Sequence, residues 1–218
     1  MGEFLDLATW KRREHFELYR TSAQPFFSIA VEIDVTKVYD QTREPTSPSF
    51  LVAMLHRTMV AARETPALCL RLRGDRVWSH DALRLSTTVM RADDTFGFAV
   101  LEPRPTLNAF ANHARSELER AKRLGPLVIP VGDDIVYHST LPWVRFTSFT
   151  NAINTGADSI PRIVFGKRFR DGPRWMMPVA VEVHHAVVDG LDVARFIERL
   201  EKGPDVAGAE TTDTRPTR

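Results

Sequence analysis

The sequence predicts an α+β protein, a mixed α/β sandwich in which helices pack on one large mixed β-sheet. Two apolar periodicities alternate along the chain: a spacing of three to four residues, typical of amphipathic helices, and a spacing of two, typical of half-buried strands. Turn signals such as Gly74-Asp75 and Asp171-Gly172 separate neighbouring strand-like segments. Together these observations indicate helices packed on a sheet.

The first elements follow from the apolar spacing. Residues 10–21 are expected to form a helix, with Phe16 and Tyr19 three apart on one face. Alternate residues are apolar in 27–33, which predicts a strand. In 49–63 leucine and methionine recur every four residues and a proline follows, so we expect a second helix that ends before the proline.

Strands dominate the next part of the chain. Segments 68–73 and 76–79 are expected to be strands on either side of Gly74-Asp75. Segments 83–90 and 95–101 are predicted to form two more strands.

A polar helix is then expected at 106–123, followed by a short strand at 134–140. Residues 163–169 and 175–184 are expected to be strands that flank the turn at Asp171-Gly172.

Length and composition fit one globular domain. The 218 residues are 43% hydrophobic and 26% charged, which is ordinary for a protein with a sizeable core. We expect a single domain over residues 1–203. Residues 204–218 are small, polar and rich in threonine, which predicts a disordered tail.

Charge and cysteine content limit the classes of partner. A net charge of +1 gives no field that would attract a nucleic acid or a membrane, and we expect neither as a partner. We expect Arg71, Arg73 and Arg76 to lie on solvated strand edges and turns. The single cysteine, Cys69, excludes an intrachain disulfide, and the first residues show no signal segment. The expected location is therefore the cytoplasm.

Residues 176–200 carry the candidate chemistry. A mostly apolar strand ends in His184-His185, and a helix with one apolar face begins after Asp189-Gly190. An imidazole at the end of a rigid strand can be held at a cleft, and it accepts a proton near neutral pH. Gly190 would permit a turn that a side chain obstructs, and Asp189 could accept backbone N–H groups or hold an arginine.

A purely structural interpretation of the same motif stays open. His185 could be a hydrogen-bonded core histidine, Asp189 a helix cap and Gly190 a turn residue. The doubled histidine favours catalysis, because alternation along a strand sends His184 and His185 to opposite faces. One of them can then face a cleft while the other packs behind it.

Three separated blocks resemble one enzyme family. Residues 184–200, HHAVVDGLDVARFIERL, resemble the C-terminal signature of chloramphenicol acetyltransferases. The HxxxDG core of this signature is also found in dihydrolipoyl acyltransferases and in peptide-synthetase condensation domains, which are much longer. Residues 10–20, WKRREHFELYR, resemble the opening helix of chloramphenicol acetyltransferases, and residues 139–149 resemble a later segment. On these blocks the chain is identified as a member of that family.

The resemblance implies a mechanism. In the family, the residue corresponding to His185 is the general base: it deprotonates the acceptor hydroxyl, which attacks the thioester of acetyl-CoA directly. The serine that stabilises the oxyanion corresponds to Ser139. The motif aspartate, Asp189, pairs with an arginine that corresponds to Arg12, with Arg13 as a close alternative. The pair, together with Gly190, is implied to support the structure of the site.

The resemblance also implies the remaining site residues and the assembly. The acceptor pocket would be lined by Tyr19, Phe27, Phe96 and Tyr137. CoA would be contacted by Trp143 and Lys167, although Lys167 could equally be a solvated strand lysine, and Tyr19 and Phe27 could be ordinary core. The family forms a homotrimer with active sites between subunits, so that the histidine and much of the acceptor pocket come from different chains.

Departures from the family concern the acceptor more than the acyl transfer. Val188 stands where the family usually has a cysteine, Val164 where it has a threonine, Tyr137 where it has an asparagine and Asp192 where it has a histidine. Pro25 and Phe26 replace smaller or different residues in the stretch that lines the pocket. We expect an acetyl-CoA-dependent O-acetyltransferase without a metal, with chloramphenicol as the first acceptor to test. One alternative is transfer to another hydroxyl or amine in secondary metabolism. The other is that the protein is a non-catalytic homologue that binds a ligand.

Overall fold

The computed structural model describes residues 2–153 and 158–203, and the predicted tail at 204–218 lies outside the described residues. The helices are α1 (Arg13–Tyr19), α2 (Thr36–Gln41), α3 (Phe50–Arg63), α4 (Leu107–Lys122) and α5 (Gly190–Lys202), with a 3₁₀ turn at η1 (Pro66–Cys69). The strands are β1 (Gly2–Phe4), β2 (Phe26–Asp34), β3 (Leu70–Arg73), β4 (Arg76–His80), β5 (Arg84–Met90), β6 (Phe96–Leu101), β7 (Ile135–Thr140), β8 (Arg162–Phe165), β9 (Phe169–Asp171) and β10 (Arg174–His184).

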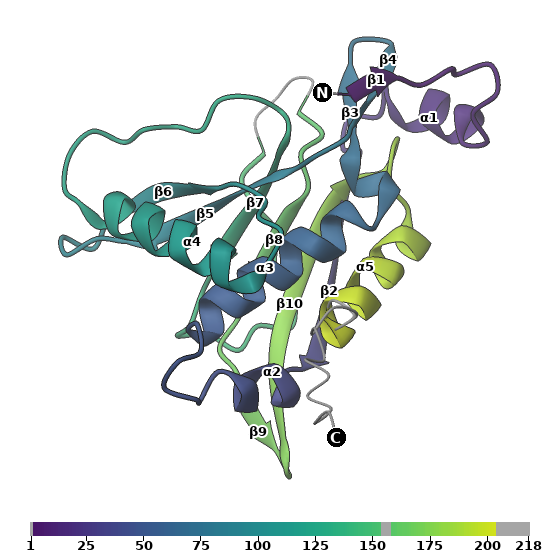
Figure 1. The fold of residues 1–218 in the computed structure, drawn as a ribbon. Coiled ribbons are helices and arrows are strands. Elements are labelled where there is room, and N and C mark those ends of the chain that lie inside the picture. Colours follow the sequence, from purple (N-terminus) through teal and green to yellow (C-terminus); the bar gives the residue numbers. More distant parts are fainter. Residues whose placement is uncertain (1, 154–157, 204–218) are drawn as a thin grey trace, which may run out of the picture.

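Most strands form one seven-stranded sheet with the order β2-β10-β8-β7-β5-β6, to which β9 adds beside β10. The β5–β7 and β7–β8 pairs are parallel and the other pairs are antiparallel, so the sheet is mixed, as expected. A separate three-stranded sheet with the order β1-β4-β3 was not anticipated. It lies beside α1, at one end of the molecule (Figure 1).

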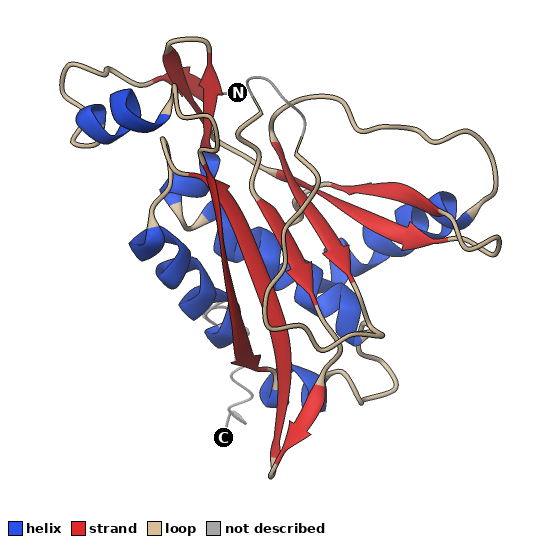
Figure 2. Cartoon of the chain, turned by 180° about the vertical axis from the view of Figure 1, so that it is seen from behind, coloured by secondary structure: helices blue, strands red, loops and turns tan. Residues whose placement is uncertain are grey.

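Helices α3, α4 and α5 cover one face of the large sheet (Figure 1). Seen from behind, the opposite face carries no helix among the described residues, and a long loop runs across it (Figure 2). Side chains of β10 alternate accordingly: Val179, Val181 and Val183 belong to the main core under the helices. On the other face Ala180 packs with Phe146 of the covering loop. Burial on both sides explains why β10 reads as an almost continuous apolar run.

The predicted strand 163–169 is divided in the structure. Strand β8 ends at Phe165, and β9 begins only at Phe169. Between them the loop that contains Val144 and Phe146 crosses at Gly166, where an added Cβ would lie 3.0 Å from both residues. The backbone N–H of Lys167 donates to the carbonyl of Val144 over 2.8 Å, so the chain leaves the sheet ladder at this crossing.

The expectation that Arg71 is solvated was wrong. Its side chain is 1% exposed, and its guanidinium donates to four backbone carbonyls, those of Leu68, Leu70, Asp133 and Ile135. Burial lowers the pKa of Arg71 to about 10, which still leaves it charged at neutral pH. Arg71 therefore ties the small sheet to the start of β7. Arg73 and Arg76 are exposed, as expected.

Within the described ranges, no helix is both long enough and apolar enough to cross a lipid bilayer.

Candidate active site

His185 directly follows the central strand β10 and is held by its backbone and its ring. The last ladder pair joins His184 to Phe26 of β2, and the N–H of His185 donates to the carbonyl of Pro25 over 2.8 Å. Nδ1 of His185 lies 3.2 Å from the carbonyl oxygen of Val188. Because a carbonyl can only accept, this contact places the proton on Nδ1 and leaves Nε2 with a free lone pair. Nε2 can then act as a general base.

Two aromatic rings fix the plane of the imidazole. Tyr19, the last residue of α1, stacks on His185 with ring centroids 4.0 Å apart and an interplanar angle of 16°. Phe27 of β2 lies against the same imidazole at 4.7 Å. The imidazole is only half-buried, so it is oriented by its neighbours and still open to a reactant.

Asp189 joins α5 to α1. It is the N-cap of α5, with its side chain accepting the N–H groups of Leu191 at 3.0 Å and Asp192 at 3.3 Å. The carboxylate of Asp192 accepts the N–H of Asp189 in return, which completes a capping box. Arg12 forms a salt bridge with Asp189 and also donates to the carbonyl oxygen of His185 over 3.2 Å. Arg12 therefore braces the turn that carries His185.

The expected role of Gly190 in the turn is not found. Its φ is not in the left-handed region, and an added Cβ would meet no atom within 4 Å. A side chain would not obstruct this turn within one chain, so backbone geometry gives no reason for glycine here.

His184 has different surroundings from His185. It is buried against Phe26, with ring centroids 5.0 Å apart, and its Nδ1 accepts the N–H of Ala186 at 3.2 Å. Burial lowers the pKa of His184 to about 4. His184 is therefore a neutral packing residue near pH 7, and His185 is the one available as a base.

Ser139 belongs to a second group, on the helix-free face of the sheet. Thr88 of β5 donates to its hydroxyl oxygen over 3.3 Å. Strand alternation places Tyr137 on the same face as Ser139, two residues earlier. The β5–β6 register sets Phe98 opposite Thr88 and Phe96 opposite Met90. Ser139 therefore lies among polar and aromatic side chains from three adjacent strands.

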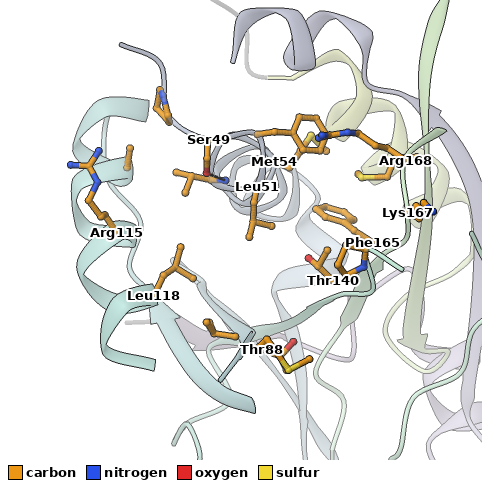
Figure 3. Close-up of a pocket in the computed structure, with 18 of the residues that line it drawn as sticks. Ser49, Leu51, Met54, Thr88, Arg115, Leu118, Thr140, Phe165, Lys167 and Arg168 are labelled. Carbon is orange, nitrogen blue, oxygen red and sulfur yellow. Dashed lines mark hydrogen bonds between the residues drawn. The ribbon is translucent and has the colours of Figure 1, made fainter. Parts of the chain in front are cut away.

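A cavity of about 880 Å³ lies between α3, α4 and the ends of β5, β7 and β8 (Figure 3). Trp143 and Lys167 both line it. Its body is apolar, formed by residues such as Leu51, Met54 and Phe165, and further cations lie around it: Arg115, Lys122 and Arg168. Thr88 of β5, whose hydroxyl donates to Ser139, is also among the residues that line the cavity. Thr88 could not be predicted from the sequence, because only strand pairing shows that it adjoins Ser139.

The two groups are far apart within one chain. Ser139 pairs with Val164, which pairs with Ala180, five residues before His185. At about 3.3 Å per residue and about 4.8 Å between strands, this is about 16 Å along the sheet and about 10 Å across it. A single chain therefore does not bring Ser139 and His185 together.

No group of three or more histidine, cysteine, aspartate or glutamate side chains suited to a metal ion occurs in the part of the chain that the structure describes.

Comparison with known proteins decides the family. The model of the chloramphenicol acetyltransferase family matches residues 3–201. The chain belongs to the chloramphenicol acetyltransferase family. Chloramphenicol acetyltransferase 3 of Escherichia coli is 32% identical over 202 residues, covering 90% of this chain and 94% of the relative. The chloramphenicol acetyltransferase of Streptomyces acrimycini is 31% identical over 204 residues, covering 90% and 91%.

Solved structures share the fold. A chloramphenicol acetyltransferase superposes with a TM-score of 0.80 at 23% identity, covering 93% of this chain and 99% of the other. A probable dihydrolipoamide acetyltransferase from Listeria monocytogenes gives a TM-score of 0.67 at 15% identity, covering 87% of each chain. As a member of the chloramphenicol acetyltransferase family, the present chain is an acyltransferase. Its architecture is the expected α+β one.

Proposed function

We propose that the protein transfers the acetyl group of acetyl-CoA to a hydroxyl group of chloramphenicol, which inactivates the antibiotic. The observation that carries the proposal is the held imidazole of His185, with Nδ1 bonded to a carbonyl and Nε2 free, in a chain of this family. Its relatives are named for acetyl transfer to chloramphenicol.

The reaction needs one base and one oxyanion donor. Nε2 of His185 takes the proton of the acceptor hydroxyl as its oxygen attacks the thioester carbon. The carbonyl oxygen becomes an oxyanion, and the hydroxyl of Ser139 donates a hydrogen bond to it, worth about 3 kcal/mol in comparable sites. When the intermediate collapses, the C–S bond breaks and the protonated His185 returns its proton to the CoA sulfur. The products are the acetyl ester and CoA.

The cavity of Figure 3 has the chemistry that an acyl-CoA requires. Its apolar body suits the long pantetheine arm, while Lys167 and Arg168 suit the phosphate groups. Trp143, whose exposed fraction is 60%, offers a flat apolar surface in the same wall. Thr88 lines the cavity and bonds to Ser139, so the thioester end of a bound acyl-CoA would lie toward β5 and β7.

The separation of Ser139 from His185 supports a homotrimer with its active sites between subunits. His185, Tyr19 and Phe27 form one half of each site, and Ser139 with Phe96 and Tyr137 forms the other. Exposed apolar side chains supply a surface for such contacts: Met90, Phe96, Leu124, Leu127, Val128, Ile129 and Val131. A head-to-tail contact of this kind closes into a ring when the rotation is one third of a turn.

The first test is thiol release from acetyl-CoA, followed with a chromogenic thiol reagent with and without chloramphenicol. The expected result is a chloramphenicol-dependent rate that is absent in His185→Ala and unchanged in His15→Ala, a matched control on the exposed side of α1. CoA binding without a chloramphenicol-dependent rate would reject chloramphenicol as the acceptor and point to another alcohol or amine. If the protein shows no rate and does not bind CoA, the non-catalytic alternative is favoured.

Subunit mixing tests the site between chains. His185→Ala and Ser139→Ala are each expected to be nearly inactive, and co-expression of the two should restore activity. With random mixing, about one quarter of the interfaces combine an intact His185 with an intact Ser139. If the mixture is no more active than the average of the two variants, each site lies within a single subunit.

A further inference from the structure

A second cavity lies away from the groups assigned to acyl transfer. It has a volume of about 430 Å³, within the range of about 300–1,000 Å³ common for ligand pockets. Four residues of α3 line it at helical spacing, His56, Met59, Val60 and Arg63, and so present one stripe of the helix. The first cavity uses a different stretch of the same helix, from Phe50 to Met54. The two cavities therefore lie against different stretches of α3.

The lining is basic at the rim and apolar within. Arg63 and Lys202 end α3 and α5, Arg199 lies one turn before Lys202, and Arg104 stands on the loop after β6. Glu64 is the one carboxylate among the described lining residues. Met59, Val60 and Leu83 supply apolar surface, and prolines on both sides of Arg104 stiffen its loop.

Several of these cations are not neutralised by the protein. In residues 2–153 and 158–203, the guanidinium groups of Arg63 and Arg199 have no hydrogen bond or salt bridge, and that of Arg104 bonds only to the carbonyl of Pro103. Lys202, by contrast, is paired with Glu198 at 2.6 Å. The pocket therefore keeps an excess of positive charge.

Two buried polar residues stand behind the rim. His56 and Arg57 are each 9% exposed. Arg57 donates to the carbonyl of Glu201 over 3.1 Å and faces no carboxylate among its described partners. Gly203, which lines the cavity, has a φ of 76° and passes so close to Arg57 that an added Cβ would lie 2.6 Å from its guanidinium carbon. The backbone is thus shaped around a buried guanidinium next to the pocket.

The attraction of cations to helix C-termini explains only part of this arrangement. It accounts for Arg63, Arg199 and Lys202, which lie in the last turns of α3 and α5. The guanidinium of Arg57 also donates to a carbonyl of the last turn of α5, that of Glu201. The attraction does not account for Arg104 on a loop, or for a hollow with an apolar floor between these cations. An arginine fork is the side chain best matched to a phosphate group.

We infer that this cavity binds a small organic anion carrying a phosphate group, at a site separate from acyl transfer. Arg63, Arg104 and Arg199 would hold the phosphate, and Met59, Val60 and Leu83 would contact the organic part. Because the cavity bridges α3 and α5, a bound ligand would join the helix that lines the first cavity to the helix that follows His185.

Calorimetric titration of the full chain with inorganic pyrophosphate tests the site, with the first cavity filled by saturating CoA. The expected result is one pyrophosphate per chain, with a Kd at least tenfold higher in the double variant Arg63→Gln/Arg199→Gln. The matched double variant Arg115→Gln/Lys122→Gln, which removes two cations from the first cavity, should leave the Kd unchanged.

Absence of pyrophosphate binding at millimolar concentration would overturn the inference. A loss of pyrophosphate affinity that occurs only in the Arg115→Gln/Lys122→Gln variant would overturn it as well. If Arg63→Gln/Arg199→Gln does not fold, Arg104→Gln serves instead, since this side chain is exposed and bonds only to its neighbour's carbonyl. An unchanged Kd in Arg104→Gln would then reject the site. Acetyl transfer is a separate measurement, so the two proposals can fail independently.

Discussion

Replacing Asp189 with alanine removes two roles of one carboxylate, and each can be estimated from its surroundings. As the N-cap of α5, Asp189 accepts two backbone N–H groups, and losing such a cap costs about 1 kcal/mol. As the partner of Arg12, it neutralises a side chain that is 18% exposed, while its own side chain is 37% exposed. Solvent screens such a pair, so about 2 kcal/mol is expected instead of the roughly 3–5 of a fully buried pair.

Asparagine at the same position separates the two roles. Asparagine caps helices as well as aspartate does but carries no charge. The free energy of unfolding should therefore fall by about 2 kcal/mol in Asp189→Asn and by about 3 kcal/mol in Asp189→Ala. Denaturant unfolding at pH 7 measures both values, and in a chain of this size the alanine variant should melt roughly 6–12 °C lower. Turnover should also fall, because Arg12 holds the carbonyl of His185. Melting temperatures equal to that of the wild type in both variants would refute the bracing role of the pair.

The pH dependence of the same variants gives a further check. Desolvation raises the pKa of Asp189, but Arg12 and the backbone N–H groups outweigh it, so the pKa lies below its ordinary value of 3.8. A carboxyl whose pKa is lowered by folding stabilises the protein when ionised, and this contribution is lost as the pH falls through that pKa. The difference in the free energy of unfolding between the wild type and Asp189→Asn should therefore be constant above about pH 5 and become smaller below about pH 4.

Three other substitutions, one of them with a matched control, test separate parts of the structure. Ser139→Ala should lower kcat by about 10²–10³ in the thiol-release assay while leaving the melting temperature unchanged. Arg71→Met should cost about 3 kcal/mol or more in denaturant unfolding, because three buried carbonyls and one part-buried carbonyl lose their donor. Arg76→Met, by contrast, should change the free energy of unfolding by less than about 0.5 kcal/mol. Burial lowers the pKa of His138 to about 3, so this histidine takes up a proton on unfolding when the pH is below about 6.5. The proton uptake should lower the free energy of unfolding by about 2 kcal/mol at pH 5, and His138→Val should not show this pH dependence.

The regular elements were predictable because their periodicity is strong. The stripe of Leu51, Leu55 and Met59 forms α3, and the turn at Gly74 joins β3 to β4 with a φ of 65°. Short elements were missed where too few residues exist to show a period, as in β1 and α2. The break at Gly166 could not be predicted, since it depends on a loop that arrives from twenty residues earlier in the chain.

The site was predictable in part. The motif around His185 is local, so its strand, cap and helix could be inferred from adjacent residues. Contacts across long separations could not: the bond from Thr88 to Ser139 and the burial of Arg71 depend on which strands become neighbours. Arg12 was assigned to Asp189 through family resemblance, and no pattern in the sequence itself joins residues that far apart.

The position of β10 has a consequence for how activity is lost on heating. From Val179 to Glu182 this strand is paired on both sides, with β2 and with β8. Amide hydrogens in such a doubly paired, buried strand exchange with solvent only when the whole domain opens. His185 is attached directly to this strand, so the base cannot be displaced by partial melting of that segment. Hydrogen exchange at Val181 and thermal inactivation should therefore report the same cooperative event.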